Sequence, residues 1–171
     1  MNLKLIAFGM ISVLALGTSC NNSQTEKNTT LTTSDSTVKA TANLKEDSIA
    51  FNVSGKTYTG LAVYDENIKG KRPGIIVVPE WWGLNDYTKS RAKQLAELGY
   101  FAMAIDMYGD GKTADNPTEA QKMAGPFYQN LQMTRKRFDA ALAKLKTYPQ
   151  VDTNKIAAIG YCFGGGVVLN M

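Results

Sequence analysis

The sequence predicts an α/β domain whose mostly parallel sheet is flanked by helices and begins with an antiparallel hairpin. Two alternating stretches separated by Ser54-Gly55 predict the hairpin. Residues 75–78 are a continuous β-branched run without alternation, which is typical of a strand buried on both faces of a parallel sheet. Such runs alternate with helical segments, and this alternation favours a parallel sheet covered by helices.

Local signals place the elements in order. The expected strands are residues 49–53, 56–64, 75–78, 100–105 and 155–160. The expected helices are residues 86–98, a helix that starts at Asn116 and is interrupted by Gly125-Pro126, and residues 131–148. Asp86 can cap the first helix, and Gly99 follows its end. The apolar face of the last helix is expected to contain Leu131, Phe138, Leu142 and Leu145.

Composition excludes several classes of function. The net charge of +4 is modest, and basic residues are scattered among acidic ones, so we expect no nucleic-acid partner. The chain has no histidine, which excludes a Cys-His or Ser-His pair and a histidine metal site within it. Its two cysteines, Cys20 and Cys162, lie in different parts of the chain, so we expect no disulfide, metal or cofactor.

Residues 1–20 are expected to be a signal peptide. Lys4 precedes an apolar run from Leu5 to Leu16, which is shorter than the about 20 residues that a membrane span needs. The segment that ends at Cys20 resembles a bacterial lipoprotein signal, although Gly17 stands where leucine is preferred. The resemblance implies export from the cytoplasm and a lipid anchor at Cys20. Ordinary cleavage, which would give a periplasmic or secreted protein, is the alternative.

Residues 21–47 are polar and are expected to form a disordered tether. Such a run has too few apolar side chains for burial to offset the loss of chain entropy. Residues 48–171 are then expected to form the folded domain.

The most informative stretch is Gly160-Tyr161-Cys162-Phe163-Gly164, which follows a strand-like run and precedes a short helix. This is the pattern of a nucleophile elbow with cysteine in place of serine. The turn is so tight that residues two before and two after the nucleophile must lack side chains. The helix N-terminus favours a thiolate at Cys162. A buried cysteine in a glycine-rich turn is the alternative.

Glu80, Asp106 and Cys162 each follow an expected strand, and ligands of parallel sheets bind at these carboxyl ends. The motifs around them resemble the dienelactone hydrolase family of α/β-hydrolases over about residues 50–171. The residues that carry the resemblance are Pro73–Asn85, Leu98–Tyr100, Asp106–Gly109 and Gly160–Gly165. The resemblance implies hydrolysis of an ester or lactone bond, as in a carboxymethylenebutenolidase.

The resemblance also implies roles for individual residues. Cys162 matches the nucleophile, and Glu80 matches a glutamate that helps the thiol to ionise. The backbone N–H groups of Trp81 and Phe163 match an oxyanion hole. Two further aromatic residues are expected to line the pocket, namely Trp82 and Tyr108. Asp106 is expected to accept hydrogen bonds from loop backbone groups.

The chain departs from the family in three respects, the first of which is Pro79, where many relatives carry histidine. Asp110 stands where dienelactone hydrolase has a substrate-binding arginine, which argues against a carboxylate substrate. The family supplies its triad aspartate and histidine after later strands, and neither is in this chain. We therefore expect an incomplete α/β-hydrolase fold that is truncated after the elbow and inactive alone, from a fragment or a truncated gene. The alternatives are an inactive, lipid-tethered binding protein and a redox-sensing thiol at Cys162.

Overall fold

The structure is a computed structural model that describes residues 41–171. The expected signal peptide, Cys20 and residues 21–40 of the expected tether lie outside the described residues. The strands are β1 (Leu44–Val53), β2 (Lys56–Asp65), β3 (Arg72–Val78), β4 (Phe101–Ile105) and β5 (Val151–Gly160). The helices are α1 (Asp86–Glu97), α2 (Pro117–Gln129), α3 (Leu131–Lys146) and α4 (Phe163–Leu169).

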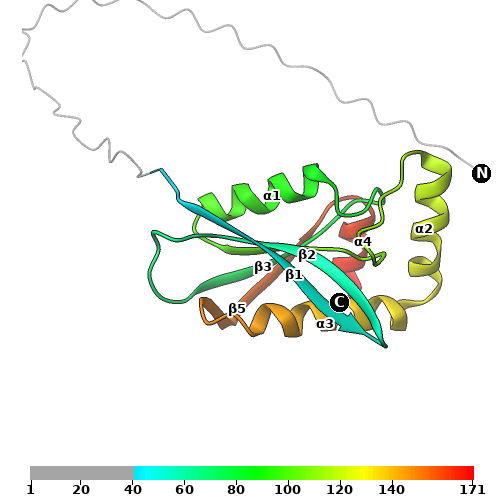
Figure 1. Cartoon of the computed structure of the whole chain (residues 1–171). Helices are drawn as coiled ribbons and strands as arrows, with labels where there is room; N and C mark the ends of the chain where they lie inside the picture. The colour runs from blue at the N-terminus through cyan, green and yellow to red at the C-terminus, as the bar shows by residue number, and fades with distance from the viewer. Residues whose placement is uncertain (1–40) are drawn as a thin grey trace, which may run out of the picture. The chain divides into compact units, whose positions relative to one another are not determined.

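The strands form one twisted sheet in the order β1-β2-β4-β3-β5 (Figure 1). β1 and β2 are an antiparallel hairpin, and β2 joins the rest of the sheet by antiparallel pairing with β4. β3 pairs in parallel with both β4 and β5. The expected α/β fold, with a hairpin followed by a parallel sheet, is therefore confirmed, and β5 lies at an edge of the sheet.

The hairpin alternates as the sequence predicts. Ile49 and Phe51 are buried, while Ala50 and Asn52 are exposed. β1 begins at Leu44 rather than near Ser48, so the strand extends into the segment expected to be a tether. Antiparallel pairing of this early part of β1 with the end of β2 supplies the backbone hydrogen bonds that a tether would lack.

The helices cover both faces of the sheet. α1 packs one face with small residues such as Ala92 and Ala96, and the strand residues there include Ile75 and Val77. The other face is covered mainly by α3, with α4 beside it, and Figure 1 shows α1 and α3 on opposite sides of the sheet. Strand residues of that face include Ile76, Val78, Phe101 and Met103. The helices cover the faces of the sheet but not the carboxyl ends of β3, β4 and β5. Ligands of parallel sheets bind at these ends, so the candidate site is expected there.

The start of α1 differs by one residue from the prediction. Asn85, not Asp86, caps the helix, and its side-chain oxygen accepts a hydrogen bond from the Thr88 N–H at 3.1 Å. A capping residue has an extended backbone, as Asn85 has, whereas Asp86 is already helical. Gly99 follows the end of the helix with φ at +96°, as expected.

The interruption predicted at Gly125-Pro126 is wrong, because α2 continues through both residues to Gln129. Proline removes one helical donor, and the carbonyl left without it belongs to Lys122. Lys122 and Pro126 are both exposed, so water can satisfy that carbonyl.

The third helix ends at Lys146, two residues before the expected end at Tyr148. Leu131 is also not part of its apolar face, because its side chain is 52% exposed. Leu131 is the first residue of α3, whereas Phe138 and Leu145, further along the helix, reach the core, as expected.

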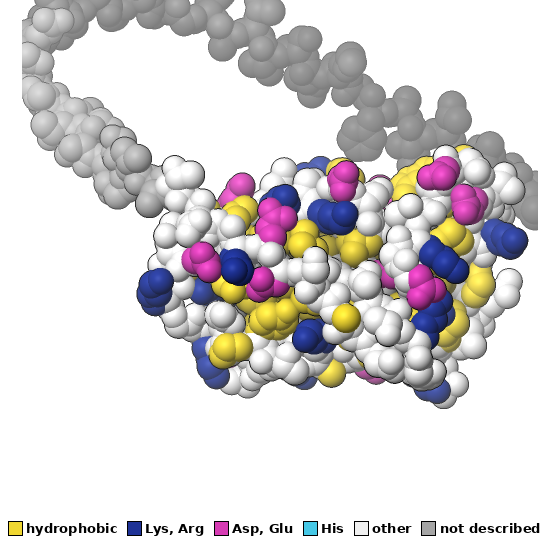
Figure 2. Space-filling view, in the orientation of Figure 1, with side chains coloured by type: hydrophobic (Ala, Val, Ile, Leu, Met, Phe, Trp, Pro, Cys, Tyr) yellow, Lys and Arg dark blue, Asp and Glu magenta, His cyan; other side chains and the backbone are white. Residues whose placement is uncertain are grey.

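Figure 2 shows acidic and basic side chains interspersed on the face in view, as the sequence predicts. Within residues 41–171 no helix has both the length and the apolar character needed to cross a membrane. The same residues hold no group of three or more metal-ligating side chains that could bind a metal ion.

Candidate active site

Cys162 occupies a strained turn between β5 and α4. Its φ of 51° and ψ of −112° lie outside the regions that side-chain-bearing residues favour. Such a conformation costs about 1–3 kcal/mol and persists only where the surroundings impose it. The thiol is exposed and free. Strain at an exposed thiol is the feature that the elbow pattern predicts.

Two glycines allow the turn to close. A Cβ on Gly160 would overlap the backbone of Gly164 in the first turn of α4. A Cβ on Gly164 would lie 2.5 Å from the carbonyl oxygens of Val78 and Pro79 at the end of β3. The structure therefore gives the physical reason for the glycines two before and two after Cys162.

Glu80 and Cys162 lie at the ends of neighbouring parallel strands. Val78 pairs with Gly160, and Glu80 and Cys162 each follow two residues later. Glu80 is half-buried, and its carboxylate has no hydrogen bond or ion pair with any other described residue, Cys162 included. The fold thus brings both residues to one edge of the sheet and leaves the carboxylate available to a proton donor.

The expected oxyanion donors lie on the two segments that meet at the elbow. Trp81 is in a turn after β3, and Phe163 is the first residue of α4. Neither backbone N–H donates to another group within the described part of the chain. Two unpartnered N–H groups at adjacent strand ends can stabilise a developing oxyanion.

The two expected pocket residues differ in their surroundings. The ring of Trp82 is half-buried and meets the ring of Trp81 edge-on, with centroids 5.3 Å apart. Tyr108 is only 7% exposed, and its hydroxyl donates to the Trp81 carbonyl at 2.8 Å. Burial raises the pKa of the Tyr108 hydroxyl, and the charges of Tyr128 and Asp106 raise it further. Tyr108 therefore stays protonated, and remains a donor, at neutral pH.

Asp106 holds the loop that follows β4, as expected. It is fully buried, and one carboxylate oxygen accepts from the N–H groups of Tyr108 and Gly109 at 2.8 and 2.9 Å. The other oxygen accepts from the Gly111 N–H at 3.0 Å. The prediction that Asp106 satisfies loop donors is confirmed.

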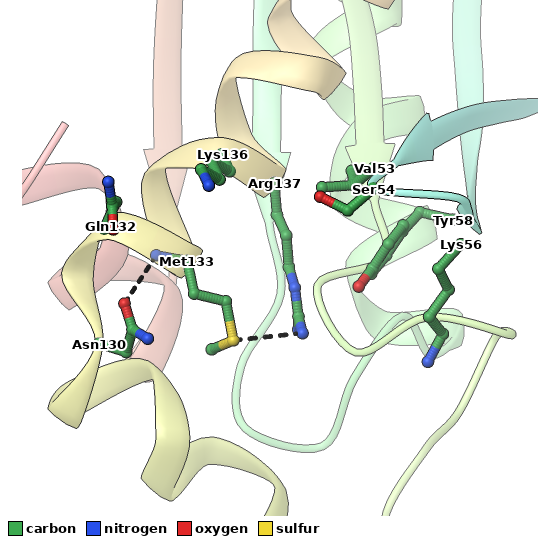
Figure 3. Close-up of a pocket in the computed structure, with 9 residues that line it drawn as sticks. All are labelled: Val53, Ser54, Lys56, Tyr58, Asn130, Gln132, Met133, Lys136 and Arg137. Atoms are coloured by element: carbon green, nitrogen blue, oxygen red, sulfur yellow. Dashed lines mark hydrogen bonds between the residues drawn. The ribbon is translucent and has the colours of Figure 1, made fainter.

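The sequence did not reveal the role of Arg137. Its guanidinium donates to the Met107 carbonyl at 2.6 Å and lies over the rings of Tyr58 and Phe127. It lines a cavity of about 320 Å³ at the tip of the hairpin, where Figure 3 shows it extended between Met133 and Tyr58. Because Arg137 already binds protein groups, we assign it to holding the β4 loop. Its position in α3 gave no signal of a contact 30 residues away.

A mixed sheet in which β3, β4 and β5 run parallel, flanked by helices and with a strained turn at the end of β5, is the architecture of an α/β-hydrolase. Residues 59–171 match the dienelactone hydrolase family, and the chain belongs to that family.

Individual relatives support this assignment. The chain is 35% identical over 97 residues to protein usf of Aquifex pyrophilus, covering 54% of this chain and 42% of that protein. It is 33% identical over 105 residues to an Aquifex aeolicus protein provisionally named a carboxymethylenebutenolidase, covering 57% and 43%. A solved dienelactone hydrolase-like promiscuous phosphotriesterase from metagenomic libraries is 38% identical, with a TM-score of 0.71, and the match covers 74% and 53%. The chain therefore spans about half the length of these relatives.

Proposed function

We propose that this chain carries the nucleophile-bearing part of an ester or lactone hydrolase, with Cys162 as the nucleophile. The observation that carries the proposal is the strained, exposed Cys162 in a turn that closes only because Gly160 and Gly164 lack side chains. A small carboxylic ester or lactone is the proposed substrate. The membership of the hydrolase family supports this class.

The proposed reaction begins when the Cys162 thiol gives its proton to the Glu80 carboxylate. The sulfur then attacks the carbonyl carbon, a C–S bond forms, and the N–H groups of Trp81 and Phe163 stabilise the resulting oxyanion. The tetrahedral intermediate then collapses, and the bond between the carbonyl carbon and the leaving alkoxide oxygen breaks. The alkoxide takes the proton from Glu80, and the acyl group remains as a thioester on Cys162.

Hydrolysis of the thioester requires a base that activates water. The 171 residues contain no histidine, so no imidazole of this chain can take that part. By resemblance to the family, an aspartate and a histidine from later strands would complete the triad. We therefore expect this chain to be acylated by activated esters but to turn over little or no ester.

Asp110 bears on the choice of substrate. It forms an ion pair with Lys56 at 3.1 Å, and its side chain is 54% exposed. Lys112 also lies 3.9 Å from the Asp110 carboxylate, so both lysines are paired with it at the position where dienelactone hydrolase has a carboxylate-binding arginine. We propose uncharged esters or lactones for this reason.

Acylation can be tested on the chain itself. In a Cys20→Ser background, p-nitrophenyl acetate is expected to add one acetyl group, which mass spectrometry of peptides would locate on Cys162. An acetyl group found only on lysines, or none at all, would contradict the proposal. The control is to denature the chain before adding the ester. If the folded turn activates the thiol, Cys162 is expected to be acetylated more slowly in the denatured chain.

The alternative is a catalytically inactive, lipid-tethered binding protein. It is favoured by the absence of a hydrogen bond between Glu80 and Cys162 in the described part of the chain. A chain that unfolds cooperatively yet forms no thioester would support this alternative. Formation of the thioester at Cys162 would count against it.

We further propose that Cys20 anchors the exported protein to a membrane through a lipid. In a bacterial host, the chain is expected to incorporate a palmitate analogue and to sediment with membranes, because lipidation adds buried CH₂ groups. Cys20→Ser is expected to lose both the label and the membrane fraction. A wild-type chain that is exported but unlabelled would instead indicate ordinary cleavage.

A further inference from the structure

We propose that Tyr108 is a positioning residue that holds both oxyanion donors in place. This inference rests on the proposed function, because it assigns to Tyr108 a part in forming the thioester. Tyr108 lies in the loop after β4, 27 residues from Trp81. Its hydroxyl donates to the Trp81 carbonyl and not to the Cys162 thiol.

The first basis is the turn that carries Trp81. Its three successive carbonyls each accept one hydrogen bond: Glu80 from the Gly83 N–H at 3.1 Å, Trp81 from the Tyr108 hydroxyl at 2.8 Å, and Trp82 from the Ala114 N–H at 3.0 Å. With all three carbonyls held, the Trp81 N–H has a defined direction and no partner among the described residues. The bond from Tyr108 is the one of the three that a side chain makes, so it can be removed by substitution.

The second basis is the contact of Tyr108 with Phe163. The two rings stack with centroids 6.0 Å apart and an interplanar angle of 27°. Phe127 closes the group, with its ring edge-on to both. One side chain therefore supports Trp81 through its hydroxyl and Phe163 through its ring.

Tyr108 is itself held firmly. The buried Asp106 accepts from its backbone N–H at 2.8 Å. Arg137 donates to the carbonyl of the preceding residue, Met107, at 2.6 Å. Because the backbone of Tyr108 is held, its hydroxyl loses little conformational entropy when it bonds to the Trp81 carbonyl. It can therefore position the turn on that other segment.

Tyr108→Phe removes the hydroxyl and keeps the ring that stacks on Phe163. The Trp81 carbonyl then lacks a partner, and the turn can shift toward water. A small displacement of the Trp81 N–H weakens its bond to the oxyanion, and such bonds depend strongly on geometry. Reaction at Cys162 that develops no oxyanion would be unaffected.

Two reagents separate these effects in the Cys20→Ser chain. Acylation by p-nitrophenyl acetate passes through an oxyanion, whereas alkylation by iodoacetamide displaces iodide and develops none. We expect Tyr108→Phe to slow acylation of Cys162 by about tenfold and to leave the alkylation rate unchanged. Tyr128→Phe is the matched control, because Tyr128 also contacts the Phe163 ring but its hydroxyl makes no hydrogen bond to another residue in the range 41–171.

The outcomes distinguish this inference from the proposed function. If Cys162 is acylated equally fast in Tyr108→Phe and the parent chain, the positioning role is wrong and the nucleophile assignment stands. If the parent chain is not acylated at Cys162, the proposed function is wrong, and the positioning role of Tyr108 is overturned with it. Equal slowing of acylation and alkylation would indicate a general loss of structure and would also overturn the inference.

Discussion

Gly164→Ala is expected to destabilise the fold by about 3 kcal/mol or more, because an added methyl group has no room. The Cβ would lie 2.5 Å from the carbonyl oxygens of Val78 and Pro79. Both obstacles are backbone atoms at the end of β3, so rotating a side chain cannot relieve the overlap. Either α4 or the end of β3 must move, and each carries part of the candidate site. Urea unfolding of the variant and the parent would measure the difference in unfolding free energy.

Gly166→Ala is the matched control, two residues further along α4. A Cβ there meets nothing within 4 Å, and Gly166 lies inside the helix. Alanine is favoured over glycine in a helix by about 1 kcal/mol, so this variant is expected to be more stable than the parent. If the two variants lost stability equally, close packing would not explain the glycine at position 164.

The elbow could be predicted from sequence because its cause is local. The glycines at 160 and 164 are needed by a turn of five residues, and the turn is readable within them. The hairpin was predictable for the same reason, because alternation and a two-residue turn define it. Residues 75–78 form a continuous apolar run because their side chains pack against helices on both faces of the sheet. This run predicted the parallel core.

The errors arose where distant parts of the chain or solvent decide the structure. Pro126 stays inside α2, where it and Lys122 are exposed, so water can satisfy the carbonyl that lacks a donor; no local pattern shows this exposure. Leu131 is 52% exposed although Thr134, in the same turn of α3, is buried, and the periodicity of the sequence did not separate the two. Tyr108 acts on Trp81 across 27 residues, so its position in the motif gave no sign of its hydrogen bond.

The candidate site divides in the same way. Cys162 and Glu80 were placed at strand ends from the order of the elements, and the pairing of Val78 with Gly160 puts those ends side by side. Asp106 was predictable as a loop acceptor because short loops after strands leave N–H groups that a carboxylate can satisfy. The contacts that hold Trp81 and Phe163 required the three-dimensional structure.

Replacing Cys162 is expected to separate reactivity from stability. Cys162→Ala and Cys162→Gly both remove the thiol and are expected to abolish acylation by p-nitrophenyl acetate in the Cys20→Ser background. Alanine keeps a Cβ at φ 51° and ψ −112°, so it keeps the backbone strain. Glycine adopts this region freely, and we expect Cys162→Gly to be about 1–2 kcal/mol more stable than Cys162→Ala.

Glycine is usually less stabilising than alanine, so the expected order at position 162 is reversed. Ala143→Gly measures the usual order for comparison. Ala143 is exposed within α3, where glycine is expected to cost about 1 kcal/mol relative to alanine. Urea unfolding of the three variants would measure both differences. Acylation that persists in Cys162→Ala would place the nucleophile elsewhere. Equal stability of the two Cys162 variants would mean that the turn stores no strain, and strain is what sets this exposed cysteine apart from an ordinary surface thiol.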